Sequence, residues 1–161
     1  MHQLSTLWLE YAEDFRTLRK GSIGSLYHAM NFTENVERLN NTAGNIVSQM
    51  NLIDKRKARS IAQYYIDMQC TIKKVHTMLN VGGACFFVIG NTEYKGIKID
   101  NAKHLTECLL TEGFSEIEVD RRKISNKILT PYRDVNGKFA SIKGCSRKVY
   151  SEEFVIFAKK I

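Results

Sequence analysis

Apolar residues recur at helical spacing throughout the first half of the chain. The longest periodic run extends from Asp54, a candidate N-cap, to Leu79. Its apolar positions are three or four residues apart, which places them on one face of a helix of about seven turns. Two shorter runs of the same kind cover residues 3–19 and 33–53, the second with Thr33 as its candidate N-cap. The pattern therefore predicts three amphipathic helices in this half.

The second half contains runs with strand-like spacing. After a Gly-Gly turn, residues 84–89 are ACFFVI, six apolar residues in succession, which predicts a strand covered on both faces. Residues 115–120 alternate between apolar and acidic side chains, as in a strand with one exposed face. Residues 154–158 (FVIFA) form a last apolar run. Three strands are therefore expected. The last two are joined by a long connection without a helix, so they should pair in antiparallel fashion.

A short hairpin and a helix are predicted between the first two strands. Residues 93–99 have the length of a hairpin-like excursion. Asp100 or Asn101 is a candidate N-cap for a helix that ends at Thr111, with Gly113 as the expected stop. We expect four side chains of this helix to face inward: Ala102, Leu105, Cys108 and Leu109. Helices that feed buried strands indicate the α/β class, here with a partial sheet of three strands preceded by three helices.

The composition is that of one globular domain of 161 residues, with 43% apolar and 25% charged side chains. We predict a single domain over 1–161, helical over 1–80 and built on the sheet over 81–161. No apolar run approaches the roughly 20 residues of a membrane span, and the N-terminus lacks a secretory signal pattern. We therefore expect a cytoplasmic protein without a membrane partner. The four cysteines form no CxxC pair and the four histidines lack ligand spacing, so we interpret the cysteines as structural and propose no metal.

The net charge of +7 comes from one stretch, residues 121–148, which we call the basic segment. It contains nine basic residues and one acidic residue, whereas the rest of the chain contains 15 basic and 16 acidic residues. The basic residues are Arg121, Arg122, Lys123, Lys127, Arg133, Lys138, Lys143, Arg147 and Lys148. Their concentration, with Tyr132 and Phe139 among them, favours a polyanionic partner. A solvated loop is the alternative interpretation.

Several segments in this order are similar to one protein family. They are a long helix, LNVGGACFFVIGN, KGIKID, a helix that ends in LLTEGF, the turn RRKISNK, and SEEFVIFAKK. The order resembles the C-terminal half of S-adenosylmethionine-dependent DNA amino-methyltransferases, which modify cytosine N4 or adenine N6. The resemblance implies that the three strands are part of a Rossmann-like methyltransferase sheet. In that family a leader helix is followed by L-K-P-G-G, a hydrophobic strand and IG(N/D); here Asn80-Val81 replaces Lys-Pro. LSTLWLEYAEDFRTLRKGSIGS resembles the segment that follows the family's catalytic loop.

The catalytic and cofactor motifs of that family are not found in this sequence. Its catalytic loop is (D/N/S)-P-P-(Y/F/W), in which polar groups hold the target amino group and the aromatic ring stacks on the extruded base. This sequence has a single proline, Pro131, and no F-x-G-x-G turn. The resemblance thus implies the C-terminal subunit or fragment of a split methyltransferase of restriction–modification type, inactive alone. A complementary half would carry the catalytic loop and bind most of the S-adenosylmethionine.

The resemblance also implies roles for individual segments. The strand 84–89 would dock beside the catalytic-loop strand of the partner, and Asn91 and Thr92 would line the substrate side. The nine basic residues of the basic segment would contact DNA phosphates, and Tyr132 would touch the bases. Second-rank phosphate contacts are Arg16, Arg19 and Lys20. Because an unpaired parallel strand with apolar residues on both faces is a poor sheet edge, we expect the chain to bind its partner, to self-associate or to be poorly soluble.

Three other interpretations fit the same residues. The chain could be a non-catalytic nucleic-acid-binding protein derived from a methyltransferase, and would then bind DNA or RNA alone with strong salt dependence. It could instead be part of an RNA methyltransferase, or the product of a truncated gene.

Overall fold

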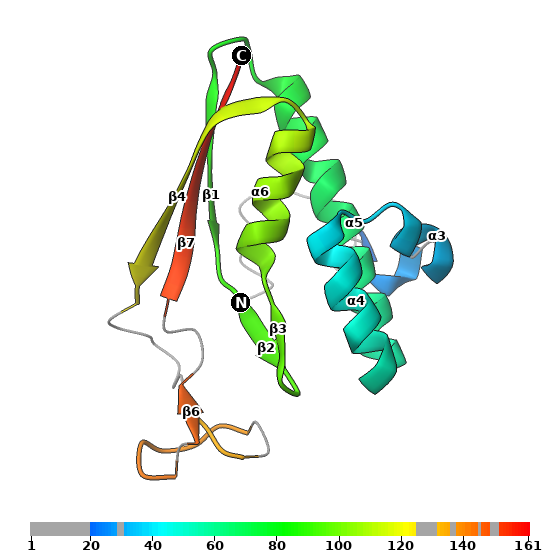
Figure 1. Cartoon of the computed structure of the whole chain (residues 1–161), viewed down its shortest axis with the longest axis vertical. Coiled ribbons are helices and arrows are strands. Elements are labelled where there is room, and N and C mark those ends of the chain that lie inside the picture. The colour runs from blue at the N-terminus through cyan, green and yellow to red at the C-terminus, as the bar shows by residue number, and fades with distance from the viewer. Residues whose placement is uncertain (1–19, 29–30, 125–131, 136–137, 145, 149–151) are drawn as a thin grey trace, which may run out of the picture. The chain divides into compact units, whose positions relative to one another are not determined.

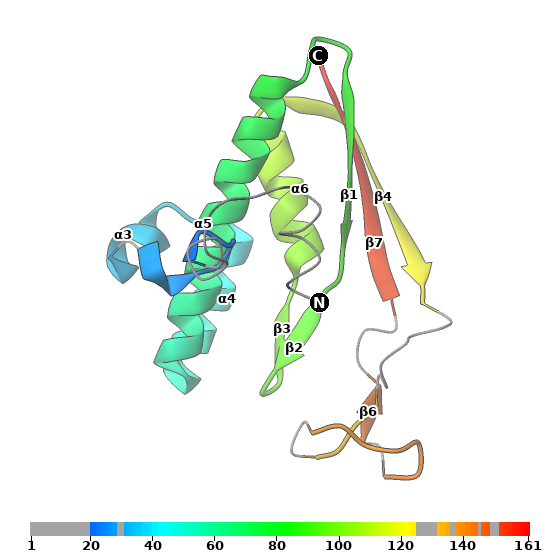
Figure 2. The ribbon, with the colours of Figure 1, turned by 180° about the vertical axis from the view of Figure 1, so that it is seen from behind.

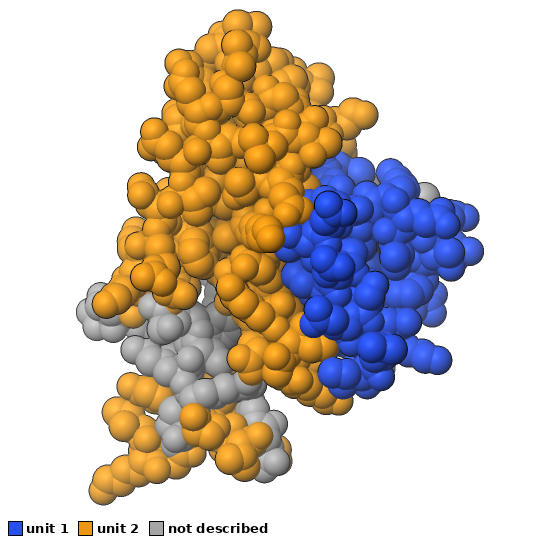
Figure 3. Space-filling model, viewed as in Figure 1, with its two compact units in different colours: residues 1–71 blue, residues 72–161 orange. Residues whose placement is uncertain are grey.

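The computed structural model in Figure 1 describes residues 20–28, 31–124, 132–135, 138–144, 146–148 and 152–161. The chain forms two compact units, residues 1–71 and residues 72–161, which Figure 3 colours separately. The division falls inside the longest helix, α5 (Lys55–Met78), whereas we placed the end of the helical part at residue 80. None of the described helices combines the length and the apolar character needed to cross a membrane.

The described part of the first unit is helical. Its elements are η1 (Leu26–His28), α3 (Phe32–Glu37), α4 (Asn41–Ile53) and the first part of α5. The helix predicted over 33–53 is thus two helices, because the Asn40 side chain accepts a hydrogen bond from the Ala43 N–H (2.9 Å) and begins α4 anew. The N-cap of α3 is Asn31, not Thr33. Asn favours cap positions over helix interiors, so the prediction of one continuous helix was wrong. The helix predicted over 3–19 lies outside the described residues.

The prediction for α5 is confirmed. Asp54 precedes the helix and accepts a hydrogen bond from the Lys57 N–H at 2.9 Å, as an N-cap does. The buried residues of the helix recur at three- and four-residue spacing: Ala58, Ile61, Ala62, Tyr65, Ile66 and Ile72. A polar chain joins α5 to its neighbours in the unit, since Asn35 donates to Gln63, Gln63 donates to Asp67, and Asp67 accepts from the Gly24 N–H. These bonds satisfy polar groups that burial would otherwise make costly.

The second unit contains a three-stranded antiparallel sheet. Its strands and its helix are β1 (Ala84–Ile89), β2 (Thr92–Tyr94), β3 (Ile97–Ile99), α6 (Asn101–Thr111), β4 (Phe114–Lys123), β5 (Tyr132–Arg133), β6 (Arg147–Lys148) and β7 (Glu152–Lys160). The strand order is β1-β7-β4, with β7 antiparallel to both neighbours. The α/β class, the three strands and the antiparallel pairing of the last two are therefore confirmed. The hairpin expected over 93–99 is β2 paired with β3.

One face of this sheet is covered by α6, as the opposite views in Figures 1 and 2 show. Asp100 caps α6, and the helix ends before Gly113, whose φ of +87° suits glycine. All four side chains that we expected to face inward are buried: Ala102, Leu105, Cys108 and Leu109. Ile156 and Ala158 of β7 are fully buried on the same face as Phe87 and Cys85 of β1. We call this side the inner face of the sheet.

The side of the sheet opposite α6, which we call the outer face, is open. Our prediction that 84–89 is covered on both faces was wrong, because exposure alternates along β1 and both Phe86 (69%) and Val88 (62%) are exposed. The expectation of an unpaired parallel strand was also wrong, because β1 pairs with β7 in antiparallel fashion along its whole length. Among the described residues β1 has no other strand neighbour, so it is an edge strand. The six apolar residues in succession therefore occupy an edge position with one uncovered face.

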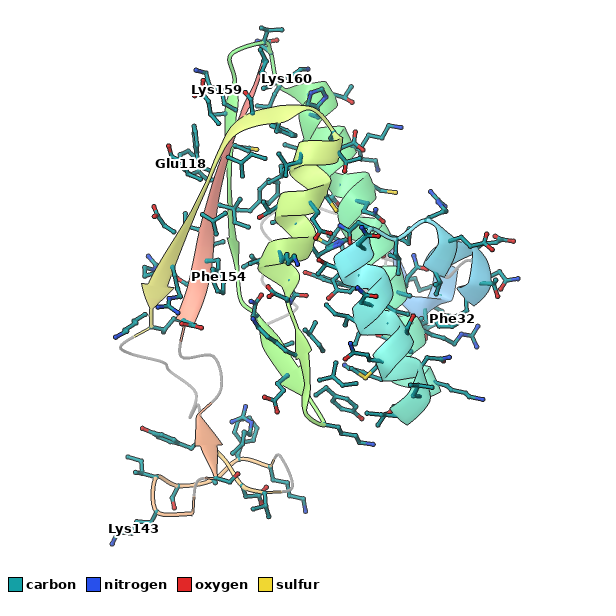
Figure 4. The ribbon with its side chains drawn as sticks, in the orientation of Figure 1. Phe32, Glu118, Lys143, Phe154, Lys159 and Lys160 are labelled. Atoms are coloured by element: carbon teal, nitrogen blue, oxygen red, sulfur yellow. The ribbon has the colours of Figure 1, made fainter. Side chains whose placement is uncertain are left out.

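Lys160 anchors the end of β7 within the second unit. Its ammonium group donates hydrogen bonds to the carbonyl oxygens of His76 (2.8 Å) and Leu79 (2.9 Å), at the C-terminal end of α5. A cation there is favourable because the last helical carbonyls have no intrahelical partners and carry partial negative charge. The His76 ring also packs edge-on against Phe114, with ring centroids 5.0 Å apart. Figure 4 labels Lys160 at the end of β7.

Candidate functional site

The open edge of β1 is the first candidate surface. The Lys160 N–H donates to the Gly83 carbonyl oxygen at 2.8 Å, immediately before the register pair Ala84–Lys159. In an antiparallel ladder only every second residue is bonded to a given neighbour. It follows that Cys85, Phe87 and Ile89 bond to β7. The N–H and C=O groups of Ala84, Phe86 and Val88 therefore point away from β7, and no strand of the described residues pairs with them.

The outer face of the sheet is the second candidate surface. The register places side chains from all three strands in rows: Phe86, Phe157 and Glu118 in one row, and Val88, Val155 and Asp120 in the next. The Phe86 and Phe157 ring centroids are 5.1 Å apart. Each row is apolar on β1 and β7 and acidic on β4. Figure 4 shows Glu118 on the side of the sheet away from α6. The sequence did not predict these rows, because they require the register between distant strands.

The first three residues of the basic segment belong to β4, because this strand continues past residue 120 to Lys123. Arg121 lies 3.6 Å from Glu152, and Arg122 forms an ion pair with Glu153. Lys123 is the register partner of Glu152. Both glutamates lie in β7, outside the basic segment, so counting charges along the sequence could not predict this compensation. All three cationic residues remain exposed, where such ion pairs contribute only about 0–1 kcal/mol.

The rest of the basic segment contains a small hairpin, β5 paired with β6. The Arg133 guanidinium lies over the Phe139 ring at 4.1 Å and donates to the Tyr132 carbonyl oxygen at 2.9 Å. Lys138 and Lys143 are exposed, whereas Tyr132 is half-buried. The hairpin therefore holds Arg133 through a cation–π contact and leaves the two lysines in solvent.

Several predicted phosphate contacts cannot be placed. Lys127, Arg16 and Arg19 lie outside the described residues, and only the backbone of Arg147 and Lys148 is described. Lys20 lies 5.7 Å from the centre of the Tyr27 ring, in the first unit. The structure thus places Arg121 and Lys123 on one face of β4 and Arg122 on the other, and it holds Arg133 in the hairpin. A role in DNA binding remains a prediction for every one of these residues.

Asn91 and Thr92, the predicted substrate-side residues, follow the C-terminal end of β1. The Asn91 amide donates to Asp100 Oδ1 at 2.7 Å and accepts from the Ala102 N–H at 3.0 Å, so it ties the end of β1 to the start of α6. Thr92 begins β2 opposite Ile99. Both positions are fixed by these contacts, and their place beside a substrate remains a prediction.

Asp100 is the titratable group at this junction whose pKa is shifted. Partial burial raises its pKa, but hydrogen bonds from Lys98, the Lys103 N–H and Asn91, together with the charge of Lys98, outweigh that effect. The pKa of the carboxyl group is therefore lower than its ordinary value. The Lys98 ammonium lies 3.0 Å from Asp100 Oδ2. The ionised carboxylate thus holds the N-terminus of α6 and the end of β3 together.

The cysteines have different environments. Cys108 is buried, with Sγ 3.6 Å from Nε2 of the buried His104. Cys85 is half-buried on the inner face, and burial raises its thiol pKa, which disfavours the thiolate. Cys70 is exposed, so burial does not support the structural role that we expected of the cysteines. Among the described residues, no group of three or more His, Cys, Asp and Glu side chains is placed to hold a metal ion.

A hollow of about 560 Å³ lies in the first unit, between the turn before η1 and α5. Its lining includes Ser22, Ser25, Tyr27 and Ser60. The described lining contains hydroxyl groups but no carboxylate, histidine or cysteine that could transfer a proton or attack a substrate. We assign no chemistry to it.

Comparison of the sequence and the structure with protein-family models, curated proteins and solved structures found no match. The functional argument therefore depends on the open sheet and on the charges around it.

Proposed function

We propose that this chain is the C-terminal subunit or fragment of a split S-adenosylmethionine-dependent DNA amino-methyltransferase of restriction–modification type. The observation that carries the proposal is β1, an apolar strand at a sheet edge whose backbone groups at Ala84, Phe86 and Val88 pair with no other described strand. A long, uncharged and unprotected edge invites strand addition. Together with the resemblance of the surrounding sequence, this edge favours a subunit that completes a sheet with a second polypeptide.

The two polypeptides would contribute different parts of the enzyme. The partner would supply the Pro-Pro-aromatic catalytic loop and would bind most of the S-adenosylmethionine, because this sequence contains neither motif. A partner strand beside β1 would end near Gly90 and Asn91 if it runs parallel to β1. Ligands in open α/β sheets bind outside the carboxyl ends of the strands. This chain would then contribute the sheet and the connection between Asn91 and α6, but no catalytic residue.

The basic segment would contact DNA phosphates. Arg121 and Arg122 are exposed and paired with glutamates of β7, so each can exchange a weak ion pair for a charge-assisted contact with a phosphate. Lys138 and Lys143 on the distal hairpin extend the cationic surface. Phosphate contacts position a protein on the duplex without reading its sequence. Recognition of the target base would then belong to the partner and to the catalytic loop.

The direct test is co-expression of this chain with the protein encoded immediately upstream of it. We expect a stable complex, calorimetric binding of S-adenosylmethionine to the complex but not to this chain alone, and methyl transfer to duplex DNA by the complex only. DNA binding by the chain alone, together with no complex and no cofactor binding by the mixture, would instead favour the non-catalytic nucleic-acid-binding protein.

A pair of variants tests whether β1 provides the interface. Val88→Pro removes an N–H that points to the open edge and leaves the bonds to β7 intact, so it should abolish the complex. Val88→Thr keeps that N–H and the β-branched shape, so strand pairing should survive. A complex that tolerates Val88→Pro as well as Val88→Thr would contradict pairing at this edge.

A further inference from the structure

We propose that the outer face of the sheet is a second docking surface, which receives an amphipathic helix of the partner subunit with a basic edge. This inference rests on the proposed function, since it names a second contact made by the same partner. It concerns the face of the sheet, whereas strand addition concerns the backbone groups at its edge.

The apolar part of this face is an exposed cluster on β1 and β7. Phe86 is 69% exposed and Val88 is 62% exposed, and they lie opposite Phe157 and Val155. These positions are about 7 Å apart along each strand and about 4.8 Å apart between strands. Side chains on one face of a helix, three or four residues apart, can cover an area of this size. The fold already covers the inner face in this manner with α6.

The acidic part of the face lies on β4, beside the apolar cluster. Glu118 is the register partner of Phe157, and Asp120 is the register partner of Val155. Both carboxylates are exposed, and neither forms an ion pair with another described residue. The third acid of this strand, Glu116, is paired with Lys159 at 3.2 Å. The outer face therefore has two carboxylates that are not neutralised by described residues.

The distance between strands allows one helix to contact both the apolar cluster and the carboxylates of β4. β4 and β1 are two strand spacings apart, or about 10 Å. A helix with its side chains is about 10–12 Å wide, so a helix seated over β1 and β7 would have one flank above Glu118 and Asp120. Lysine or arginine on that flank would complement the carboxylates, while acidic residues would be repelled.

The charge beside the apolar cluster also favours a protein helix over nucleic acid as the occupant. Phosphates above the apolar cluster would meet Glu118 and Asp120, whereas the nearest cations on this face, Arg122 and Lys159, are paired with Glu153 and Glu116. The apolar cluster is continuous with the open edge, because Phe86 and Val88 contribute both the exposed side chains and the outward backbone groups. A partner strand beside β1 would bring its own flanking helix to this face, as in sheets covered on both sides.

The first test uses a photo-crosslinking amino acid at position 86 in the complex with the upstream-encoded protein. We expect crosslinks to a helical segment of the partner that carries lysine or arginine beside its apolar positions. Crosslinks to a second copy of this chain, to residues 1–19 of this chain, or to no protein would overturn the inference.

The second test reverses the charge of the acidic strip. Glu118→Lys with Asp120→Lys should weaken the complex at least about tenfold, and the loss should shrink in high salt because the attraction is electrostatic. The matched control is Glu34→Lys with Glu37→Lys on α3, which makes the same change in net charge and should leave the dissociation constant within about twofold.

The outcomes separate the two proposals. A complex that forms and methylates DNA but ignores the reversal at Glu118 and Asp120 would overturn the helix-docking inference alone. A complex lost in Val88→Pro and weakened by the reversal supports both proposals. If no complex forms with the upstream-encoded protein, both are overturned.

Discussion

The two edges of the three-stranded sheet differ in how they are protected. On β4 the outward backbone groups belong to alternate residues that include Arg121 and Lys123, and the final residues of the strand are charged and exposed. On β1 the corresponding residues are Ala84, Phe86 and Val88, all uncharged. Charged side chains on an edge strand oppose the addition of a further strand. Within the described part of the chain, the sheet is thus protected against strand addition at β4 but not at β1, so β1 is the edge at which the proposed partner strand would add.

Both edge strands pair with β7, so a destabilising substitution in β7 should cause the largest loss of stability. Ile156 is fully buried and lies between Phe87 of β1 and Val119 of β4. We expect Ile156→Ala to destabilise the second unit by about 2–5 kcal/mol, because it removes buried methyl groups and leaves a cavity. Thermal unfolding followed by circular dichroism measures the change. Val155→Ala, on the open outer face, is the control and should cost clearly less.

Two neighbouring residues of β1 should respond differently to proline. Phe87 bonds to β7, so Phe87→Pro should remove a ladder hydrogen bond and cost about 1–3 kcal/mol. Val88 directs its N–H to the open edge, so Val88→Pro should change the stability of the isolated chain by less than about 1 kcal/mol. Chemical denaturation of the two variants gives their free energies of unfolding and so tests which residues of β1 bond to β7. Equal losses would contradict our assignment of which residues of β1 face β7.

The two ion pairs between arginines of β4 and glutamates of β7 can be removed one at a time by substitution of the glutamate. Glu152→Gln should free Arg121, and Glu153→Gln should free Arg122, so each variant should bind duplex DNA more tightly than the parent chain. Each arginine that gains a phosphate contact should steepen the plot of log affinity against log salt concentration by about one unit. Fluorescence anisotropy at several salt concentrations measures this slope. The control is Glu112→Gln, at the end of α6, which changes the net charge by the same amount. If this control steepens the salt dependence as much as the other two variants do, the gain does not come from the release of Arg121 and Arg122.

The smallest expected effect is at the junction that follows β1. The folded pKa of Asp100 lies below its ordinary value, so its contribution to stability is fully present above the unfolded pKa. That contribution is lost as the pH falls through the folded pKa. Asp100→Asn should therefore lower the unfolding temperature slightly at neutral pH and have progressively less effect in acid. The temperature difference between variant and parent, measured from neutral pH to about pH 3, tests the sign, and a difference that grows in acid would contradict it.

Local signals made part of the fold predictable. The bounds of β1 and α6 were predicted correctly because a Gly-Gly turn, an Asp cap and a glycine stop mark them. The break between α3 and α4 was missed because Asn40 occurs among several asparagines, all poor helix formers, and only the fold shows which one is a cap. The sequence therefore indicated that a helix break is favoured in this stretch but not at which asparagine it occurs.

The arrangement of the sheet and the candidate surfaces was less predictable. The pairing of β4 with β7 followed from the connection between them, but nothing in the sequence placed β7 between β4 and β1. The same register sets Glu152 and Glu153 against Arg121 and Arg122, and Glu118 and Asp120 beside an apolar cluster. These relations join residues that are distant in the chain. The basic segment was evident as a run of charge, but its partial neutralisation was not.

The central position of β7 determines when the sheet can form during synthesis. β1 and β4 leave the ribosome first, and each lacks its only described neighbour until β7 follows. Pairings between segments so distant in sequence form slowly, because a long loop must close first. During that interval β1 has two unpaired edges instead of one. If the proposed partner strand is already present, it can occupy either side of β1. Under that proposal, the order in which the two polypeptides are made should influence the yield of correctly assembled complex.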